Sequence, residues 1–206
     1  MTGTSKLTLS SEELQLVNDT SWILTKRNIM EKAALMLGEQ AAFLQDAVKG
    51  AALPGIVPAT SPKIARGENY LQLPWLMLDY PRLFDRENIF AIRTMFWWGN
   101  FFSITLQLSG SYKKMYESKL VSGVSKMKTG LFICTAADEW QHHFENDNYT
   151  AAEHLSQEEI SAVLQQKKFI KLAYKIPLQQ WNEMPLLLQH HSMALLKLLN
   201  DQLPMR

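Results

Sequence analysis

Two apolar segments joined by a glycine–asparagine pair constrain the fold of this chain more than any other feature. Residues 89–98 and 101–109 are rich in β-branched and aromatic side chains, and Gly99-Asn100 separates them. Glycine and asparagine accept the positive φ angles that a two-residue hairpin turn requires. Such a turn places Arg93 opposite Leu106 on the more apolar face of the hairpin. The sequence therefore predicts a central β-hairpin whose Arg93-bearing face packs against helices.

Helical and extended patterns follow one another along the rest of the chain. Ser10 with Glu13 and Ser156 with Glu159 have the spacing of capping boxes, in which two side chains close the first turn of a helix. The patterns predict helices at residues 10–49 (with a break near 18–21), 111–128, 156–168 and 182–200, and further strands at 70–80, 131–140 and 169–176. Prolines within and just after the segment 70–80 restrict it to a sheet edge or an irregular extended stretch.

These elements predict a single α+β domain over residues 1–206. Its mainly antiparallel sheet of four or five strands contains the central hairpin and packs against a long N-terminal helix and two or three further helices. Residues 50–68 hold three of the chain's prolines and are predicted to be a loop inside the domain, because the helices before them could not bury an apolar face alone. Residues 1–10 are predicted to be flexible.

Composition narrows the classes of function and the location. The formal net charge is +1, whereas proteins that bind a nucleic-acid backbone usually carry a strong basic excess, so no nucleic-acid partner is expected. The single cysteine, Cys134, cannot form an internal disulfide, which favours a reducing compartment and a soluble, cytoplasmic protein. Residues 94–112 lack charge, but their polar residues alternate as in a half-buried strand, so no membrane span is expected. Residues 1–11 lack the apolar run of a secretory signal.

Arg93 is the residue that most suggests a binding site. A guanidinium on the apolar face of a central strand needs a carboxylate partner or a bound anion, because an unpaired buried charge is very unfavourable. Asp79, Glu68 and Asp138 are the candidate partners. One alternative is a purely structural ion pair, and another is a one-residue register difference that turns Arg93 to the other side of the sheet.

The aromatic residues of the same region suggest what such a site could hold. Ten of them fall between residues 70 and 102. Most must fill the core, but a curved sheet lined by rings and one arginine is also typical of a small-molecule pocket. The candidate ligand-binding residues are therefore Arg93, Asp79, Tyr70, Trp75 and Trp97.

The segment 138–145 is the densest collection of metal-ligand side chains. It includes Asp138, Glu139, His142 and His143, and imidazole and carboxylate groups are what zinc, iron and manganese sites use. Neither a helix nor a strand would bring three of these side chains together locally, so a site would need a distant ligand such as His154 or His190. The alternative is a solvated acidic strand end.

A seven-residue repeat of apolar side chains marks the long N-terminal helix. Its members are Leu16, Ile23, Met30, Leu37 and Leu44. The second stripe that a true coiled coil needs is interrupted by Thr20 and Arg27. Two interpretations remain open, a helix that lies across the sheet and a helix that forms a homodimer.

No catalytic signature, cofactor fingerprint or nucleic-acid module occurs in the chain, and no cofactor is indicated. The sequence therefore leaves three hypotheses. The first is a non-catalytic domain that binds a small, anionic ligand through Arg93. The second is a metal-dependent enzyme built on the segment 138–145, and the third is a homodimeric interaction protein that uses its N-terminal helix.

Overall fold

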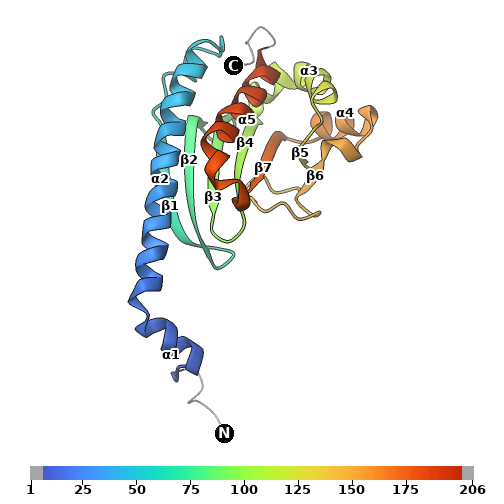
Figure 1. Ribbon diagram of the computed structural model, residues 1–206. Helices are drawn as coiled ribbons and strands as arrows, with labels where there is room; N and C mark the ends of the chain where they lie inside the picture. The colour runs from blue at the N-terminus through green and yellow to red at the C-terminus, as the bar shows by residue number, and fades with distance from the viewer. Residues whose placement is uncertain (1–6, 201–206) are drawn as a thin grey trace.

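An antiparallel sheet of seven strands organises residues 7–200, the part of the chain that the computed structural model describes (Figure 1). The strand order is β1-β2-β3-β4-β7-β5-β6. The strands are β1 (Lys63–Tyr70), β2 (Leu73–Phe84), β3 (Ile89–Trp97), β4 (Phe101–Ser109), β5 (Leu131–Cys134), β6 (Tyr149–Ala151) and β7 (Phe169–Pro177). The α+β class is confirmed, and the sheet has more strands than the four or five predicted.

Within residues 7–200, five α-helices accompany the sheet. They are α1 (Ser11–Asn18), α2 (Thr20–Lys49), α3 (Gly110–Lys126), α4 (Gln157–Gln166) and α5 (Met184–Leu199), with short 3₁₀ helices at Ala152–His154 and Leu178–Glu183. Both predicted capping boxes are formed, at Ser10 and at Ser156. Buried side chains of α2, α3, α4 and α5 form the main core with one face of the sheet. None of the helices within residues 7–200 is both long and apolar enough to cross a membrane.

The predicted break in the first helix is confirmed and has a clear cause. Asp19 lies between α1 and α2 with extended backbone angles, and its carboxylate accepts hydrogen bonds from the backbone N–H groups of Ser21 and Trp22. Asp19 therefore ends one helix and caps the next. Gly50 ends α2, as predicted.

The register predicted for the central hairpin is wrong by one residue. The loop between β3 and β4 has three residues, and Gly99 alone takes a positive φ, +72°, while the N–H of Asn100 donates to the carbonyl of Trp97. Because the loop is one residue longer than a two-residue turn, Arg93 pairs with Thr105 instead of Leu106. One residue of slip moves every side chain of one strand to the other face relative to its partner.

The corrected register changes which face meets the helices. The helix-facing side of the hairpin carries Phe90, Ile92, Phe96, Phe102, Ile104, Leu106 and Leu108, all nearly or completely buried. Arg93 lies on the opposite face, so the prediction that its face packs against the helices is wrong. We call this opposite face the outer face of the sheet.

Three further predictions need correction. β2 is not an edge strand, because it pairs with β1 on one side and β3 on the other, and its Pro81 falls at a register shift between Asp79 and Arg82 where no ladder bond is required. β1 occupies the end of the predicted loop 50–68. The strand predicted for 131–140 ends at Cys134. Residues 1–6 of the segment predicted to be flexible lie outside the described residues.

Candidate functional site

Polar side chains from four neighbouring strands meet on the outer face of the sheet. Asp79 of β2 pairs with Arg93 of β3, Arg93 pairs with Thr105 of β4, and Gln107 of β4 pairs with Lys171 of β7. Gln107 and Lys171 are buried at 0% and 1% exposure. A sheet face that carries such groups would normally be open to water, so something must cover it.

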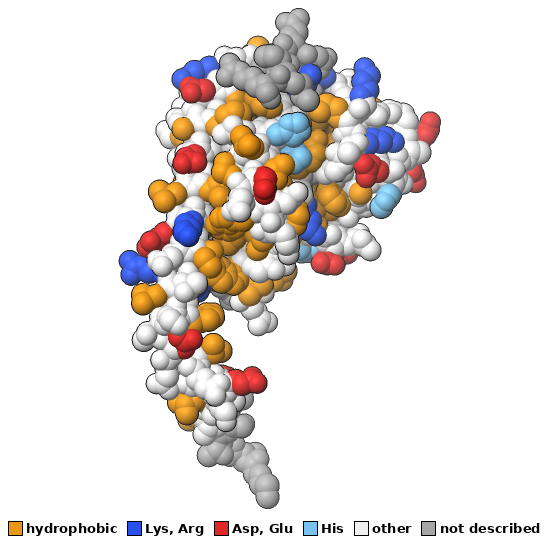
Figure 2. All heavy atoms as spheres, in the orientation of Figure 1, with side chains coloured by type: hydrophobic (Ala, Val, Ile, Leu, Met, Phe, Trp, Pro, Cys, Tyr) orange, Lys and Arg blue, Asp and Glu red, His pale blue; other side chains and the backbone are white. Residues whose placement is uncertain are grey.

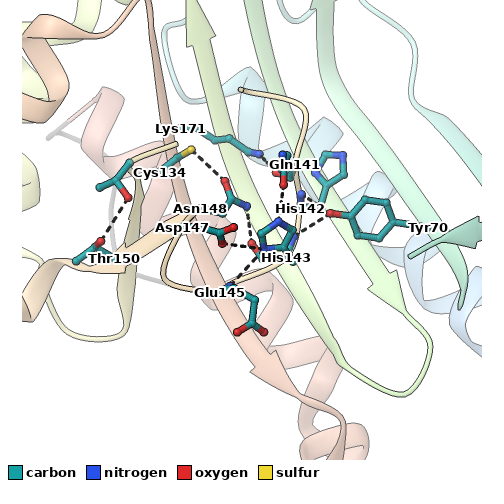
Figure 3. A network of polar contacts seen from close by, with 11 residues as sticks. Tyr70, Cys134, Gln141, His142, His143, Glu145, Asp147, Asn148, Thr150 and Lys171 are labelled. Atoms are coloured by element: carbon teal, nitrogen blue, oxygen red, sulfur yellow. Dashed lines mark hydrogen bonds and ion pairs between the residues drawn. The ribbon is translucent and has the colours of Figure 1, made fainter. Parts of the chain in front are cut away.

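The cover is the segment 135–148 between β5 and β6, which we call the covering loop. Its Glu139 carboxylate accepts a hydrogen bond of 2.8 Å from Gln107 Nε2. Lys171 Nζ donates to the backbone carbonyls of Glu139, at 3.0 Å, and of Gln141. Tyr70 Oη accepts hydrogen bonds from the backbone N–H groups of His142 and His143, at 2.7 and 3.0 Å (Figure 3). Side chains of the sheet thus hold the backbone of the loop.

Burial changes the acid–base behaviour of the residues beneath the loop. Desolvation lowers the pKa of Lys171 to about 8, although the charges of Asp138 and Glu139 act in the opposite direction. Burial, followed by the positive charges of Lys171 and Arg93, holds the pKa of His142 well below its usual value. Burial therefore favours the neutral form of His142, and Lys167 and Lys171 donate hydrogen bonds to backbone carbonyls of the loop.

Arg93 pairs with Asp79, one of the three candidate partners that the sequence offered. Its Nε lies 2.7 Å from Asp79 Oδ1, and its guanidinium carbon lies 5.3 and 5.8 Å from the ring centroids of Phe84 and Trp140. Of the other two candidates, Glu68 pairs with Lys26, and Asp138 accepts from the backbone N–H of Trp140. Arg93 Nη1 is buried and has no hydrogen-bond partner among residues 7–200.

The aromatic candidates lie at the other end of the outer face. Tyr70 and Trp97 make an edge-to-face contact at 5.1 Å, and Trp97 Nε1 donates to the carbonyl of Tyr70. Trp75 packs against the same outer-face cluster, which includes Met77 and Met95. The structure therefore places Tyr70, Trp75 and Trp97 in one packed cluster, and Arg93 with Asp79 in a separate contact on the same face.

The metal candidates are brought to one loop but not to one point. Glu139 is engaged by Gln107, His142 contacts the ring of Tyr70 at 5.6 Å, and His143 Nε2 is hydrogen-bonded to Gln141. Within residues 7–200, no group of three or more histidine, cysteine, aspartate or glutamate side chains is arranged to hold a metal ion.

Sequence reasoning missed Lys171 and Gln107, which are the buried polar centre of this face. The signal for Lys171 was present, because it is a lone charge within the otherwise apolar run Phe-Ile-Lys-Leu-Ala that begins β7. The reasoning applied to Arg93 would have selected it as well. Gln107 carries no comparable signal, since its burial depends on the path of the covering loop.

A second candidate surface lies at the start of the described chain. α1 and the first half of α2 extend beyond the sheet, and residues 7–32, which we call the arm, contain no buried residue (Figure 1). The arm nevertheless exposes large apolar side chains, and Figure 2 shows them spaced along its length. They are Leu7, Leu9, Leu14, Leu16, Val17, Trp22, Ile23 and Leu24.

The seven-residue stripe explains why the arm is apolar. Leu37 and Leu44 are fully buried in the core, whereas Leu16 and Ile23, two members of the same stripe, are 52% and 51% exposed. The stripe therefore continues past the point where the sheet ends. The second half of α2 lies across the sheet, as one of the two interpretations expects, whereas the large apolar side chains of residues 7–25 stay exposed.

A groove of about 700 Å³ lies where the arm joins the domain, between α2 and the edge strand β1. Its walls combine apolar side chains, among them Met30 and Ile64, with charged ones such as Arg66.

Comparison of the chain with models of known protein families, with curated protein sequences and with solved structures finds no match.

Proposed function

We propose that the protein is a homodimeric interaction protein that associates through its arm. The observation that carries this proposal is the apolar stripe that is buried at Leu37 and Leu44 and exposed at Leu16 and Ile23. Contiguous exposed apolar surface of this kind marks interaction sites in proteins, whereas isolated exposed apolar residues do not. Association would bury the exposed half of the stripe and lower the free energy of the assembly.

The secondary structure of the arm supports the same conclusion. α1 has eight residues and buries none of them. Helices shorter than about 12–15 residues are marginal in water unless an apolar face packs against something. The capping box of Ser10 and Glu13 contributes to α1, but one cap is worth only about 1 kcal/mol. A partner surface would supply the remaining stabilisation.

Replacing Ile23 with glutamate is expected to shift the protein from dimer to monomer. The substitution places a charge in the middle of the apolar stripe, and we expect it to weaken association about 10- to 100-fold, equivalent to about 1.4–2.8 kcal/mol. Sedimentation equilibrium of the purified protein over a range of concentrations measures this change.

A matched control is available on the same helix. Leu35 is 71% exposed on α2 but lies outside the arm, so Leu35→Glu should leave the dissociation constant unchanged. A wild-type protein that stays monomeric at every concentration, or equal effects of Ile23→Glu and Leu35→Glu, would refute the proposed function.

A second proposal concerns the outer face and retains the small-ligand hypothesis. Arg93 Nη1 and Gln107 Oε1 are buried without a hydrogen-bond partner in the described part of the chain, and Arg93 and Gln107 lie on the same face of adjacent strands. The unpaired donor, Arg93 Nη1, favours binding of a small oxyanion, because a charged oxygen would accept its hydrogen bond. Trp140, which lies over the guanidinium and is 50% exposed, would move to admit it.

Acetate, succinate and phosphate are the probes for this second proposal. At matched ionic strength, at least one of them should raise the melting temperature of the wild-type protein by a few degrees, because a ligand that binds only the native state stabilises it. The double variant Arg93→Met/Asp79→Leu, which leaves no unpaired charge, should lose this shift. The same shift in both proteins would contradict an oxyanion site at Arg93.

A further inference from the structure

The groove between α2 and β1 is lined by apolar and charged side chains, which could pack against an amphipathic helix. Its volume of about 700 Å³ falls within the range of about 300–1,000 Å³ that binding clefts occupy. Ile64 and Arg66 of β1 pair with Leu78 and Leu76, whose side chains belong to the core beneath the helices, so they point to the α2 side of the sheet. Ile64 is 42% exposed there. β1 is thus an edge strand with an uncovered apolar residue beside a helix.

The charges of the groove complement those of residues 7–25, the part of the arm that precedes Lys26. In the groove, Lys26 pairs with Glu68 at 2.9 Å and Arg27 pairs with Glu31 at 3.1 Å. These pairs leave Arg66, which also lines the groove and forms no ion pair with any described residue. Residues 7–25, by contrast, carry three acidic side chains and no lysine or arginine.

One acidic residue of α1 is placed to meet Arg66. Glu13 is engaged in the capping box with Ser10, whereas Glu12 is not part of it. Glu12 and Leu16 are four residues apart, so they lie on the same face of α1. A single helix face therefore offers a carboxylate for Arg66 and an apolar side chain for the space beside Ile64.

The arm cannot deliver this face to the groove of its own chain. On α2 the groove begins at Ile23, four residues and about 6 Å along the helix axis beyond Asp19, and continues to Ala34. To return over that distance, α1 would have to fold back against α2. Antiparallel helix pairs need a connection of about 2–5 residues, whereas Asp19 alone links α1 to α2. In Figure 1 α1 continues away from the sheet.

From these observations we infer that α1 of one copy occupies the α2–β1 groove of a second copy, and that the exchange is reciprocal. A reciprocal exchange uses the same two surfaces on both copies and closes a twofold dimer without leaving either surface free. Leu16 enters beside Ile64 of the second copy, and Glu12 pairs with its Arg66. This inference rests on the proposed homodimer and adds the mode of pairing, since two arms could instead pair with each other.

Disulfide cross-linking distinguishes the two modes. The variants Leu16→Cys and Ile64→Cys are purified separately, mixed, allowed to exchange and oxidised mildly. The native Cys134 is buried at 1% exposure and stays in place. A covalent dimer that joins the two variants should form in the mixture, with at least tenfold less in either variant alone. Leu16→Cys mixed with Leu35→Cys is the control for random collision.

The other possible outcomes contradict either the groove inference alone or the homodimer as well. Cross-linking of Leu16→Cys to itself would show that the arms pair with each other, so the groove inference would fail while the proposed homodimer stands. A sedimentation dimer with no covalent product in any mixture would likewise overturn the groove inference alone. A monomer in sedimentation would overturn both.

Charge exchange between Glu12 and Arg66 gives an independent readout. Arg66→Glu should raise the dimer dissociation constant about tenfold, because it places a like charge opposite Glu12. The double variant Glu12→Arg/Arg66→Glu should restore most of the loss. Absence of rescue would contradict the pairing of these two residues.

Discussion

Replacing Asp79 with alanine is expected to lower the free energy of unfolding by about 3–5 kcal/mol, because removal of one member of a buried ion pair leaves the other charge buried and uncompensated. The side chains of Arg93 and Asp79 are only 13% and 12% exposed, and Arg93 Nε lies 2.7 Å from Asp79 Oδ1.

Urea denaturation of purified variants measures this effect, and two controls define its cause. Asp79→Leu combined with Arg93→Met removes both charges and should be far less destabilising than Asp79→Ala alone. Asp46→Ala removes a carboxylate that faces Lys49 at the surface, where both side chains are more than 70% exposed, and should cost about 1 kcal/mol or less. Equal losses for Asp79→Ala and Asp46→Ala would contradict a buried ion pair on the outer face.

Phe96→Ala should destabilise the protein by a similar amount, about 3–5 kcal/mol, because truncation of a buried phenylalanine loses its transfer free energy and leaves a cavity. Phe96 is 1% exposed and its ring lies 5.0 Å from that of Phe102 and 5.8 Å from that of Trp181. These contacts exist because Phe96 is on the helix-facing side of β3.

The same denaturation measurement tests the corrected register of the hairpin. A double-mutant cycle with Phe102→Ala should give a coupling energy of about 0.5–1.5 kcal/mol, as expected for two rings in direct contact. Phe84, 38% exposed at the end of β2, is the matched aromatic control and should cost clearly less when truncated. A loss for Phe96→Ala no larger than for Phe84→Ala would be inconsistent with this register.

The local signals of the sequence predicted many elements accurately. Side chains that act within a few residues set the capping boxes at Ser10 and Ser156, the break at Asp19 and the bounds of β4. Each of these features depends on neighbours in the chain, so one sequence suffices to find it.

The features that the sequence did not predict depend on distant contacts. The sequence of β1 is mostly polar, because β1 is an edge strand whose side chains are mostly exposed, so it lacks the apolar pattern of a strand. β6 has only three residues, which is too short to show such a pattern. The hairpin register depended on whether the loop held two or three residues, a difference that the dipeptide Gly99-Asn100 does not reveal. That single residue decided on which face Arg93 lies.

In the candidate sites, too, the residues could be predicted from the sequence, but the contacts between distant segments could not. The sequence identified Arg93, Asp79 and the segment 138–145, but only the fold brings the covering loop over the strand face that holds Arg93 and Lys171. The stripe from Leu16 to Leu44 was visible in the sequence. Which half of it would be buried depended on where the sheet ends beneath α2.

Hydrogen–deuterium exchange of the arm, measured by mass spectrometry as a function of protein concentration, tests the central claim most directly. If the arm associates, the amides of α1 should be protected at high concentration and lose that protection on dilution, while β3 and β4 stay protected throughout, because local opening free energies differ between docked and undocked segments. Ile23→Glu should show the unprotected pattern at every concentration. Exchange of α1 that is fast at all concentrations, or slow and independent of concentration, would contradict an arm that is stabilised by a second copy of the chain.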